Sequence, residues 1–82
     1  MERDAHAIIA DMAKGSMSAF GELYDKLVSR IFNYARTITR NSVMAEDITH
    51  DVFLQTLKHA SRIGKMVDPV AYIMVATRKR QQ

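Results

Sequence analysis

The chain has 82 residues, a net charge of +3, 48% apolar residues and 26% charged residues. This length has room for one small domain, and the apolar fraction is too high for intrinsic disorder. Its uncharged runs are far shorter than the roughly 20 residues that span a bilayer, and no cysteine is present for a disulfide or a cysteine-based zinc or redox site. We therefore expect a single domain over residues 1–82 with no membrane partner.

The N-terminus carries no visible export signal. Acidic residues at Glu2 and Asp4 stand where a signal peptide has its basic region. Together with the absence of cysteine, this favours a cytoplasmic location.

Glycine, proline, serine and asparagine divide the chain into four segments, in each of which apolar residues recur about every 3.6 positions. The pattern predicts an all-α, compact four-helix domain, with a short N-terminal helix, two long antiparallel helices and, after a loop, a short C-terminal helix. The first helix, over about residues 2–14, has an apolar face and should end at Gly15 in a left-handed conformation. That face consists of Ala5, Ile8, Ile9 and Met12.

The second helix is expected to begin after Ser16 or Ser18, either of which can cap its first turn. A long apolar stripe follows and ends near residues 40–42. The stripe consists of Phe20, Leu23, Tyr24, Leu27, Ile31, Tyr34, Ala35 and Ile38.

The third helix is expected to have Glu46 and Asp47 in its first turn, where the helix dipole favours anions. Its predicted core face consists of Ala45, Ile48, Val52, Phe53, Thr56, Leu57 and Ala60.

A loop is predicted from Ser61 to Asp68, where the apolar period stops. Asp68 followed by Pro69 then predicts the N-cap and first residue of the last helix. This helix should run through Tyr72, Ile73, Ala76 and Thr77 to a basic end.

The residues that could perform catalysis are few. No nucleophile, base and oxyanion donor can be grouped from them, and no glycine-rich phosphate loop occurs. We therefore expect a protein that is not an enzyme and needs no cofactor.

One stripe of the third helix carries Asp47, His50 and Asp51 at positions i, i+3 and i+4. Three interpretations are open: a metal site, a solvated face that happens to hold a histidine, or a protein-binding face. The last is favoured because Leu54 and Lys58 fall on the same stripe, which would expose an apolar side chain among charges.

The second half of the chain is basic, since residues 52–82 hold six Lys and Arg against Asp68 alone. The cations Arg62, Lys65, Arg78, Lys79 and Arg80 occur there with Tyr72, Met66 and Met74. Cations that follow phosphates and a ring that stacks on bases suit single-stranded nucleic acid. Alternatively, the cations complement a helix dipole and Tyr72 belongs to the core.

Three motifs occur in a characteristic order. The first is FGELY at residues 20–24 with IFNYAR at 31–36, the second AEDITHDVFL at 45–54, and the third DPVAY at 68–72. From roughly Phe20 to Lys79 the chain resembles region two of bacterial sigma factors, in particular the small extracytoplasmic-function group.

This resemblance implies a non-catalytic specificity subunit of RNA polymerase that acts in transcription initiation. In the family the acidic helix docks on the clamp coiled coil of the polymerase β′ subunit, which assigns polymerase contacts to Asp47, His50 and Asp51. Leu54, on the same stripe, is expected to join them.

The family's loop and last helix bind the non-template strand of the promoter minus-ten element and extrude a base into a pocket. The resemblance therefore implies DNA contacts at Arg62, Lys65, Met66, Tyr72, Arg78 and Lys79. An anti-sigma factor is a further partner compatible with this interpretation. The alternative from another class is a small helical protein-interaction module without nucleic-acid function.

The chain departs from the family pattern at several positions. His50 stands where the family commonly has Gln, and Tyr72 where it usually has Trp. Residues 76–79 match the family's Ala-Arg-Asn stretch only loosely. We also expect no helix-turn-helix region-four domain, because the sequence ends at Gln82.

Overall fold

Helices account for all the regular structure in the computed structural model, which describes residues 3–80. They are α1 (Ala5–Ala13), α2 (Met17–Thr39), α3 (Ser42–Lys58), α4 (Ala60–Ile63) and α5 (Pro69–Lys79). Four of them correspond to the four predicted segments, so the all-α prediction is confirmed. The structure adds α4, a single helical turn, inside the predicted loop.

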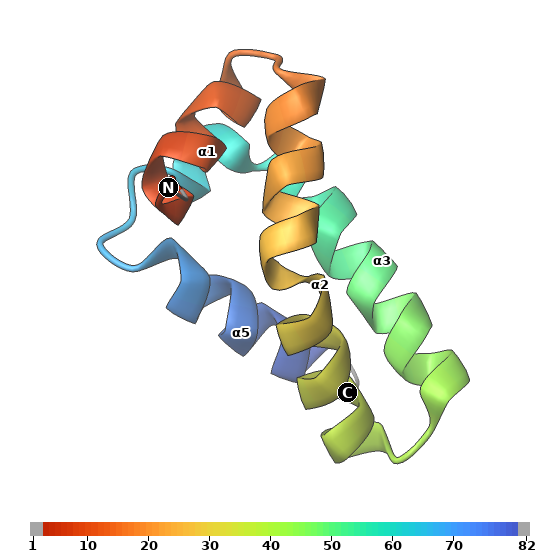
Figure 1. The fold of residues 1–82 in the computed structure, drawn as a ribbon. Helices are drawn as coiled ribbons and strands as arrows, with labels where there is room; N and C mark the ends of the chain where they lie inside the picture. Colours follow the sequence, from red (N-terminus) through yellow and green to blue (C-terminus); the bar gives the residue numbers. More distant parts are fainter. Residues whose placement is uncertain (1–2, 81–82) are drawn as a thin grey trace.

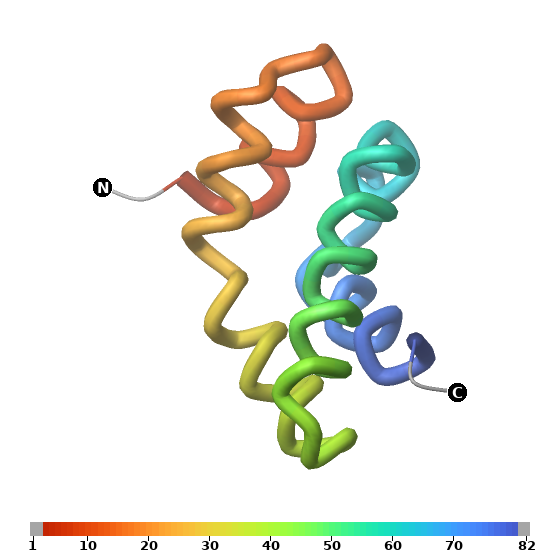
Figure 2. Tube along the Cα trace, turned by 90° about the vertical axis from the view of Figure 1, so that its right-hand side faces the viewer, coloured from red at the N-terminus to blue at the C-terminus, as the bar shows by residue number. Residues whose placement is uncertain are grey.

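The two long helices, α2 and α3, lie side by side and run in opposite directions (Figure 1). At one end of this pair, α1 packs against the first half of α2 and against α4. Farther along, α5 packs against both α2 and α3, as the two perpendicular views show (Figures 1 and 2). On α3 it lies beside the second half of the helix, where Val52, Gln55 and Thr56 line a hollow together with Tyr72 and Ile73.

Polar side chains cap the N-termini of the four longer helices. Asp4 accepts a hydrogen bond from the Ala7 amide at 3.0 Å, which starts α1. Ser16 Oγ accepts from the first turn of α2, Asn41 Oδ1 from that of α3, and Asp68 Oδ1 from that of α5. Each cap satisfies an amide that has no partner inside its own helix. The predictions of Ser16 and Asp68 as caps are confirmed.

Two left-handed residues end helices and reverse the chain. Gly15 has φ +97° after α1, as predicted, and Arg40 has φ 55° after α2. Glycine adopts this conformation at little cost, whereas Arg40 must be held there by its surroundings. Its amide donates to the Arg36 carbonyl at 2.8 Å, which closes the last turn of α2.

Three predicted boundaries are wrong. The first helix begins at Ala5 because Asp4 caps it, and Glu2, where the prediction began, lies outside the described residues. Glu46 and Asp47 lie beyond the first turn of α3, because Asn41 caps the helix earlier and it begins at Ser42. Part of the predicted loop forms α4, because Ile63 is buried and the chain folds back onto α1.

The buried apolar residues form one cluster to which every helix contributes. It consists of Ala5, Ile8, Ile9, Met12, Ala19, Leu23, Leu27, Ile31, Ala35, Ala45, Ile48, Val52, Phe53, Ala60, Ile63 and Ile73. Most of the predicted core residues are in this cluster. Phe20, Tyr34, Ile38 and Leu57 are only partly buried, and Tyr24 is exposed at the edge of the α2–α3 contact.

Three threonines are also buried, and each has its hydroxyl satisfied within its own helix. Thr49, Thr56 and Thr77 donate to the carbonyl four residues earlier, at distances of 2.7, 2.8 and 2.8 Å. A hydroxyl bonded in this way can lie in an apolar core at little cost. This explains how Thr56, predicted as a core residue, is accommodated, whereas the burial of Thr49 was not predicted.

Candidate functional site

The predicted protein-binding residues lie on the outer side of α3, and we call them the acidic surface: Asp47, His50, Asp51 and Leu54. Asp47, His50 and Leu54 are exposed, and Leu54 retains 59% of its accessible surface. Asp51 is partly covered because it pairs with Arg80. The four residues thus lie along the outer side of the helix, with Leu54 as the apolar residue at the C-terminal end of the row.

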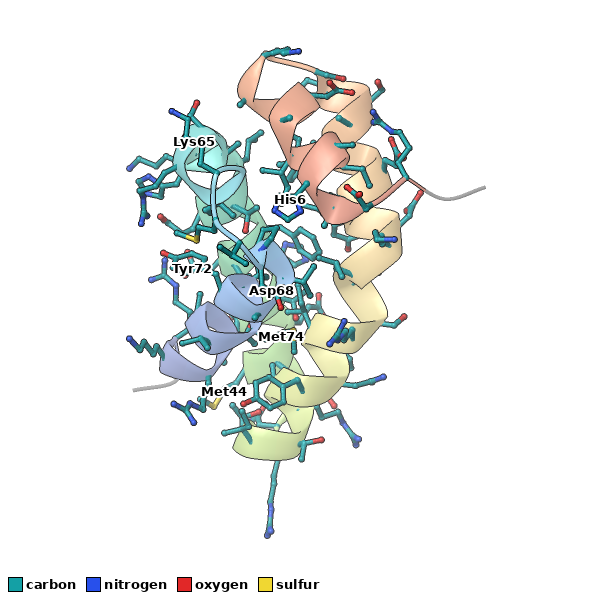
Figure 3. The ribbon with its side chains drawn as sticks, turned by 90° about the vertical axis from the view of Figure 1, so that its left-hand side faces the viewer. His6, Met44, Lys65, Asp68, Tyr72 and Met74 are labelled. Atoms are coloured by element: carbon teal, nitrogen blue, oxygen red, sulfur yellow. The ribbon has the colours of Figure 1, made fainter. Side chains whose placement is uncertain are left out.

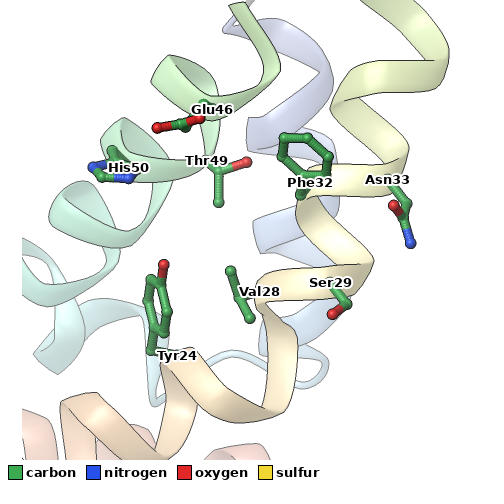
Figure 4. Close-up of a pocket in the computed structure, with 8 residues that line it drawn as sticks. All are labelled: Tyr24, Val28, Ser29, Phe32, Asn33, Glu46, Thr49 and His50. Carbon is green, nitrogen blue, oxygen red and sulfur yellow. The ribbon is translucent and has the colours of Figure 1, made fainter. Parts of the chain in front are cut away.

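A groove of about 340 Å³ lies beside the acidic surface, between α2 and α3. Tyr24, Val28 and Phe32 line it from α2, and Thr49 and His50 from α3 (Figure 4). Because successive residues of a helix point about 100° apart, His50 faces this groove while Asp51 faces α5. The acidic surface therefore extends from the groove on one side to the end of α5 on the other.

The metal interpretation of Asp47, His50 and Asp51 finds no support in residues 3–80. Within that part of the chain, no group of three or more His, Asp or Glu side chains could hold a metal ion.

The predicted nucleic-acid contacts lie around α4, the following loop and α5, and we call them the basic surface: Arg62, Lys65, Met66, Tyr72, Arg78 and Lys79. At its centre, the Arg62 guanidinium lies 5.6 Å from the centre of the Tyr72 ring. Arg62 Nη2 also donates to the Tyr72 hydroxyl at 3.3 Å. The cation and the aromatic ring predicted to act together are therefore in direct contact.

Tyr72 lies between two hollows. One, of about 160 Å³, is lined by Gln55, His59 and Arg62 among others. The other, of about 250 Å³, is lined by Val75 and Lys79 among others. Both include Tyr72, so this half-buried ring forms a wall for each. The alternative that Tyr72 belongs to the core therefore holds for only one part of its ring, and the rest faces the two hollows.

The remaining predicted contacts differ in their surroundings. Lys65 is exposed in the loop after α4, whereas Met66 is partly buried and packs against the core. On α5, Lys79 shares a side with Tyr72, but Arg78 is exposed about a third of a turn away. The structure therefore groups Arg62, Tyr72 and Lys79 and separates Arg78 from them.

Comparison with known families identifies this arrangement. The Sigma-70 region 2 family matches residues 23–81, which include both surfaces. The chain belongs to this family. The sigma-70 region 2 family is not a family of enzymes, and its match begins within α2, so α1 lies before the matched segment.

Curated relatives of this sigma-70 region 2 chain are sigma factors of the same group that the motifs resemble. The chain is 26% identical over 78 residues to the ECF RNA polymerase sigma factor SigK of Mycobacterium sp. strain KMS. The aligned segment covers 94% of the chain and 40% of that relative. The SigK protein of Mycobacterium ulcerans is 23% identical over the same length, with 42% of it covered. The chain thus spans about two fifths of the relatives it matches. No solved structure matches it.

Arg80 of this region 2 chain makes contacts that its place in the predicted basic cluster does not indicate. Arg80 lines both hollows beside Tyr72 and pairs with Asp51 of the acidic surface. Its distance from Tyr72 along α5 places it near the ring, but its pairing with Asp51 depends on how α5 crosses α3. No local pattern reveals such a contact.

None of the helices in residues 3–80 is long and apolar enough to cross a membrane.

Proposed function

We propose that this chain is the part of an ECF-type sigma factor that binds core RNA polymerase and recognises the opened minus-ten element of a promoter. The observation that carries the proposal is the family match, which spans the acidic and the basic surface together. A factor of this kind acts beside the polymerase in the cytoplasm and performs no catalysis itself.

The acidic surface is the proposed polymerase contact. Asp47 offers an exposed carboxylate on the same side of α3 as the exposed Leu54, two turns farther along, so the surface combines charge with an apolar side chain. Such a combination suits an interface in which apolar burial supplies affinity and charge supplies orientation. The proposed partner is the clamp coiled coil of the polymerase β′ subunit, and an anti-sigma factor would compete for the same surface.

The basic surface is the proposed contact for the non-template strand. Tyr72 supplies an aromatic wall for an unpaired base, while Arg62, Lys65 and Lys79 supply cations for phosphates. Extruding a base costs a few kcal/mol of stacking, which capture of that base against a ring offsets. The hollows beside Tyr72 are the proposed sites of capture.

A titration of the chain with the isolated β′ clamp coiled coil tests the polymerase contact. We expect saturable binding that Asp47→Arg abolishes, because reversing an exposed charge at the interface turns attraction into repulsion. The matched control is Asp25→Arg, which makes the same change on the exposed surface of α2 beside α1 and should leave affinity unchanged. Equal loss in both variants, or no binding by the folded chain, would contradict the assignment.

Strand preference tests the DNA contact. The chain should bind an oligonucleotide with the non-template minus-ten sequence more tightly than it binds the complementary strand. Because the two strands carry the same charge density, such a preference would come from contacts with the bases. Equal affinity for the two strands would favour the alternative of a protein-interaction module whose cations are merely solvated.

A further inference from the structure

The loop between α4 and α5, residues 64–68, carries two of the proposed DNA contacts and a very exposed apolar residue. Lys65 is exposed and Met66 partly buried, while Val67 retains 96% of its accessible surface. The Lys65 and Met66 amides donate to the Arg62 and Ile63 carbonyls at 3.2 and 3.1 Å, so the first part of the loop continues the turn of α4. Contacts with neighbouring elements add to these local hydrogen bonds.

One such contact comes from α1. His6 Nε2 lies 2.7 Å from the Met66 carbonyl oxygen, although the two residues are 60 positions apart. Because a carbonyl oxygen only accepts, Nε2 is the donor and carries a hydrogen. Figure 3 shows His6 on α1, next to the loop that runs from Lys65 to Asp68. The bond therefore ties the middle of the loop to α1.

A second contact fixes the start of the loop. A Cβ added to Gly64 would lie 3.1 Å from the Ala60 carbonyl oxygen and 3.4 Å from Ile9 Cγ2. A side chain at Gly64 would thus be crowded mainly by the α4 carbonyl and would also touch Ile9, so the start of the loop lies directly against α1. Ile9 itself is fully buried, so it offers a firm surface rather than a mobile one.

We propose that His6 is a positioning residue for the α4–α5 loop, holding it in the conformation that meets single-stranded DNA. The inference rests on the proposed function of the basic surface, and it gives α1, which precedes the segment matched by the family, a role in recognition. His6 acts through the Met66 carbonyl and need not touch DNA itself.

Amide hydrogen exchange at residues 65–67 tests the positioning role without DNA. His6→Ala removes the donor, and we expect exchange there to rise about two- to tenfold, the range expected when one hydrogen bond is lost. His6→Gln keeps a donating side chain and should restore most of the protection. The control Asp11→Ala breaks the ion pair of Asp11 with Arg3 but leaves the His6 bond in place, so exchange in the loop should stay at the wild-type level.

Strand preference in the same variants tests the link to recognition. We expect His6→Ala to reduce the ratio of affinities for the minus-ten strand and its complement by a similar factor, and His6→Gln to recover it. Unchanged exchange in His6→Ala, or an equal rise in Asp11→Ala, would overturn the positioning role. Faster exchange with an unchanged ratio would overturn its link to recognition. If the wild-type chain shows no preference, the proposed DNA function fails, while the exchange result still decides whether His6 holds the loop.

Discussion

Asp51 on α3 and Arg80 at the end of α5 form an ion pair, with Arg80 Nε 2.7 Å from Asp51 Oδ2. The pair joins the two candidate surfaces, because Asp51 belongs to the acidic surface and Arg80 lines the hollows beside Tyr72. A carboxylate of the proposed polymerase contact is therefore paired, in the free chain, with a cation beside the proposed DNA contact.

This pairing predicts that replacing its two members has different effects on polymerase binding. Asp51→Ala should weaken binding to the clamp coiled coil, because it removes a carboxylate from the proposed interface. Arg80→Ala frees the same carboxylate and should leave affinity unchanged or raise it by up to about fivefold, since exposed pairs contribute about 1 kcal/mol or less. Titration of both variants checks this. A similar loss of affinity in both would mean that the pair matters for the shape of the interface rather than for the charge of Asp51.

The geometry of α5 predicts that two neighbouring cations differ in their contribution to DNA binding. Lys79 shares a hollow with Tyr72, whereas Arg78 lies on another side of the helix. Lys79→Ala should therefore reduce the salt dependence of oligonucleotide binding by about 0.7 in the logarithmic slope, the value for one phosphate contact to a single strand. Arg78→Ala, with the same loss of charge, should change the slope much less. Equal changes would indicate that binding follows net charge alone.

An ion-pair network at the start of the chain predicts how stability depends on pH. Arg3 donates to Asp11 at 2.5 Å and to both oxygens of Glu22 at 2.7 and 3.2 Å. These hydrogen bonds hold the pKa values of Asp11 and Glu22 below their ordinary range. Since the folded-state pKa values are lowered, the stabilisation is present above the unfolded values and is lost as pH falls through the folded ones.

We therefore expect Arg3→Ala to lower the free energy of unfolding at pH 7 and to make little difference once the pH is well below about 4. Urea unfolding of both proteins across this range measures the difference. High salt should shrink it at pH 7, because the groups are on the surface and are screened. A difference that persists undiminished in acid would show that Arg3 stabilises the chain through packing instead.

Local signals explain why so much of the fold could be predicted. The face of Ala5, Ile8, Ile9 and Met12 is buried as expected because helical periodicity alone decides it. Asp68 caps α5 because an aspartate before a proline favours that geometry without help from the rest of the chain. The predicted start of α3 is too late, because it relies on Glu46 and Asp47 in the first turn. Asn41 caps the helix one turn earlier.

Contacts between distant segments explain what the sequence could not reveal. The α4 turn exists because Ile63 is buried and Gly64 fits closely against α1, and no period is detectable in so short a helix. The pairs Asp51 with Arg80 and His6 with Met66 depend on how helices cross, which patterns within one helix do not encode. The separation of Arg78 from Tyr72 and Lys79 follows from the helical period of α5, whereas the contact of Arg62 with Tyr72 depends on how α4 lies beside α5.

Two adjacent residues of α3 provide a last prediction, because one faces the core and the other faces outward. Phe53 is buried and packs against Phe20 and Tyr24, with ring centres 6.4 and 4.8 Å away, whereas Leu54 is exposed. Phe53→Ala should cost about 3–5 kcal/mol of unfolding free energy, since it removes a ring from a closely packed core. Leu54→Ala should change stability by less than about 0.5 kcal/mol.

Urea unfolding combined with the coiled-coil titration separates the two roles. Leu54→Ala should lose affinity for the coiled coil while its unfolding curve matches the wild type, because its apolar surface is available to a partner rather than to the core. Phe53→Leu, which keeps an apolar side chain in the core, should retain affinity under conditions where it is folded. A Leu54→Ala variant with wild-type affinity would show that Leu54 is not part of the proposed interface and leave Asp47 and its neighbouring polar residues as the whole of the contact.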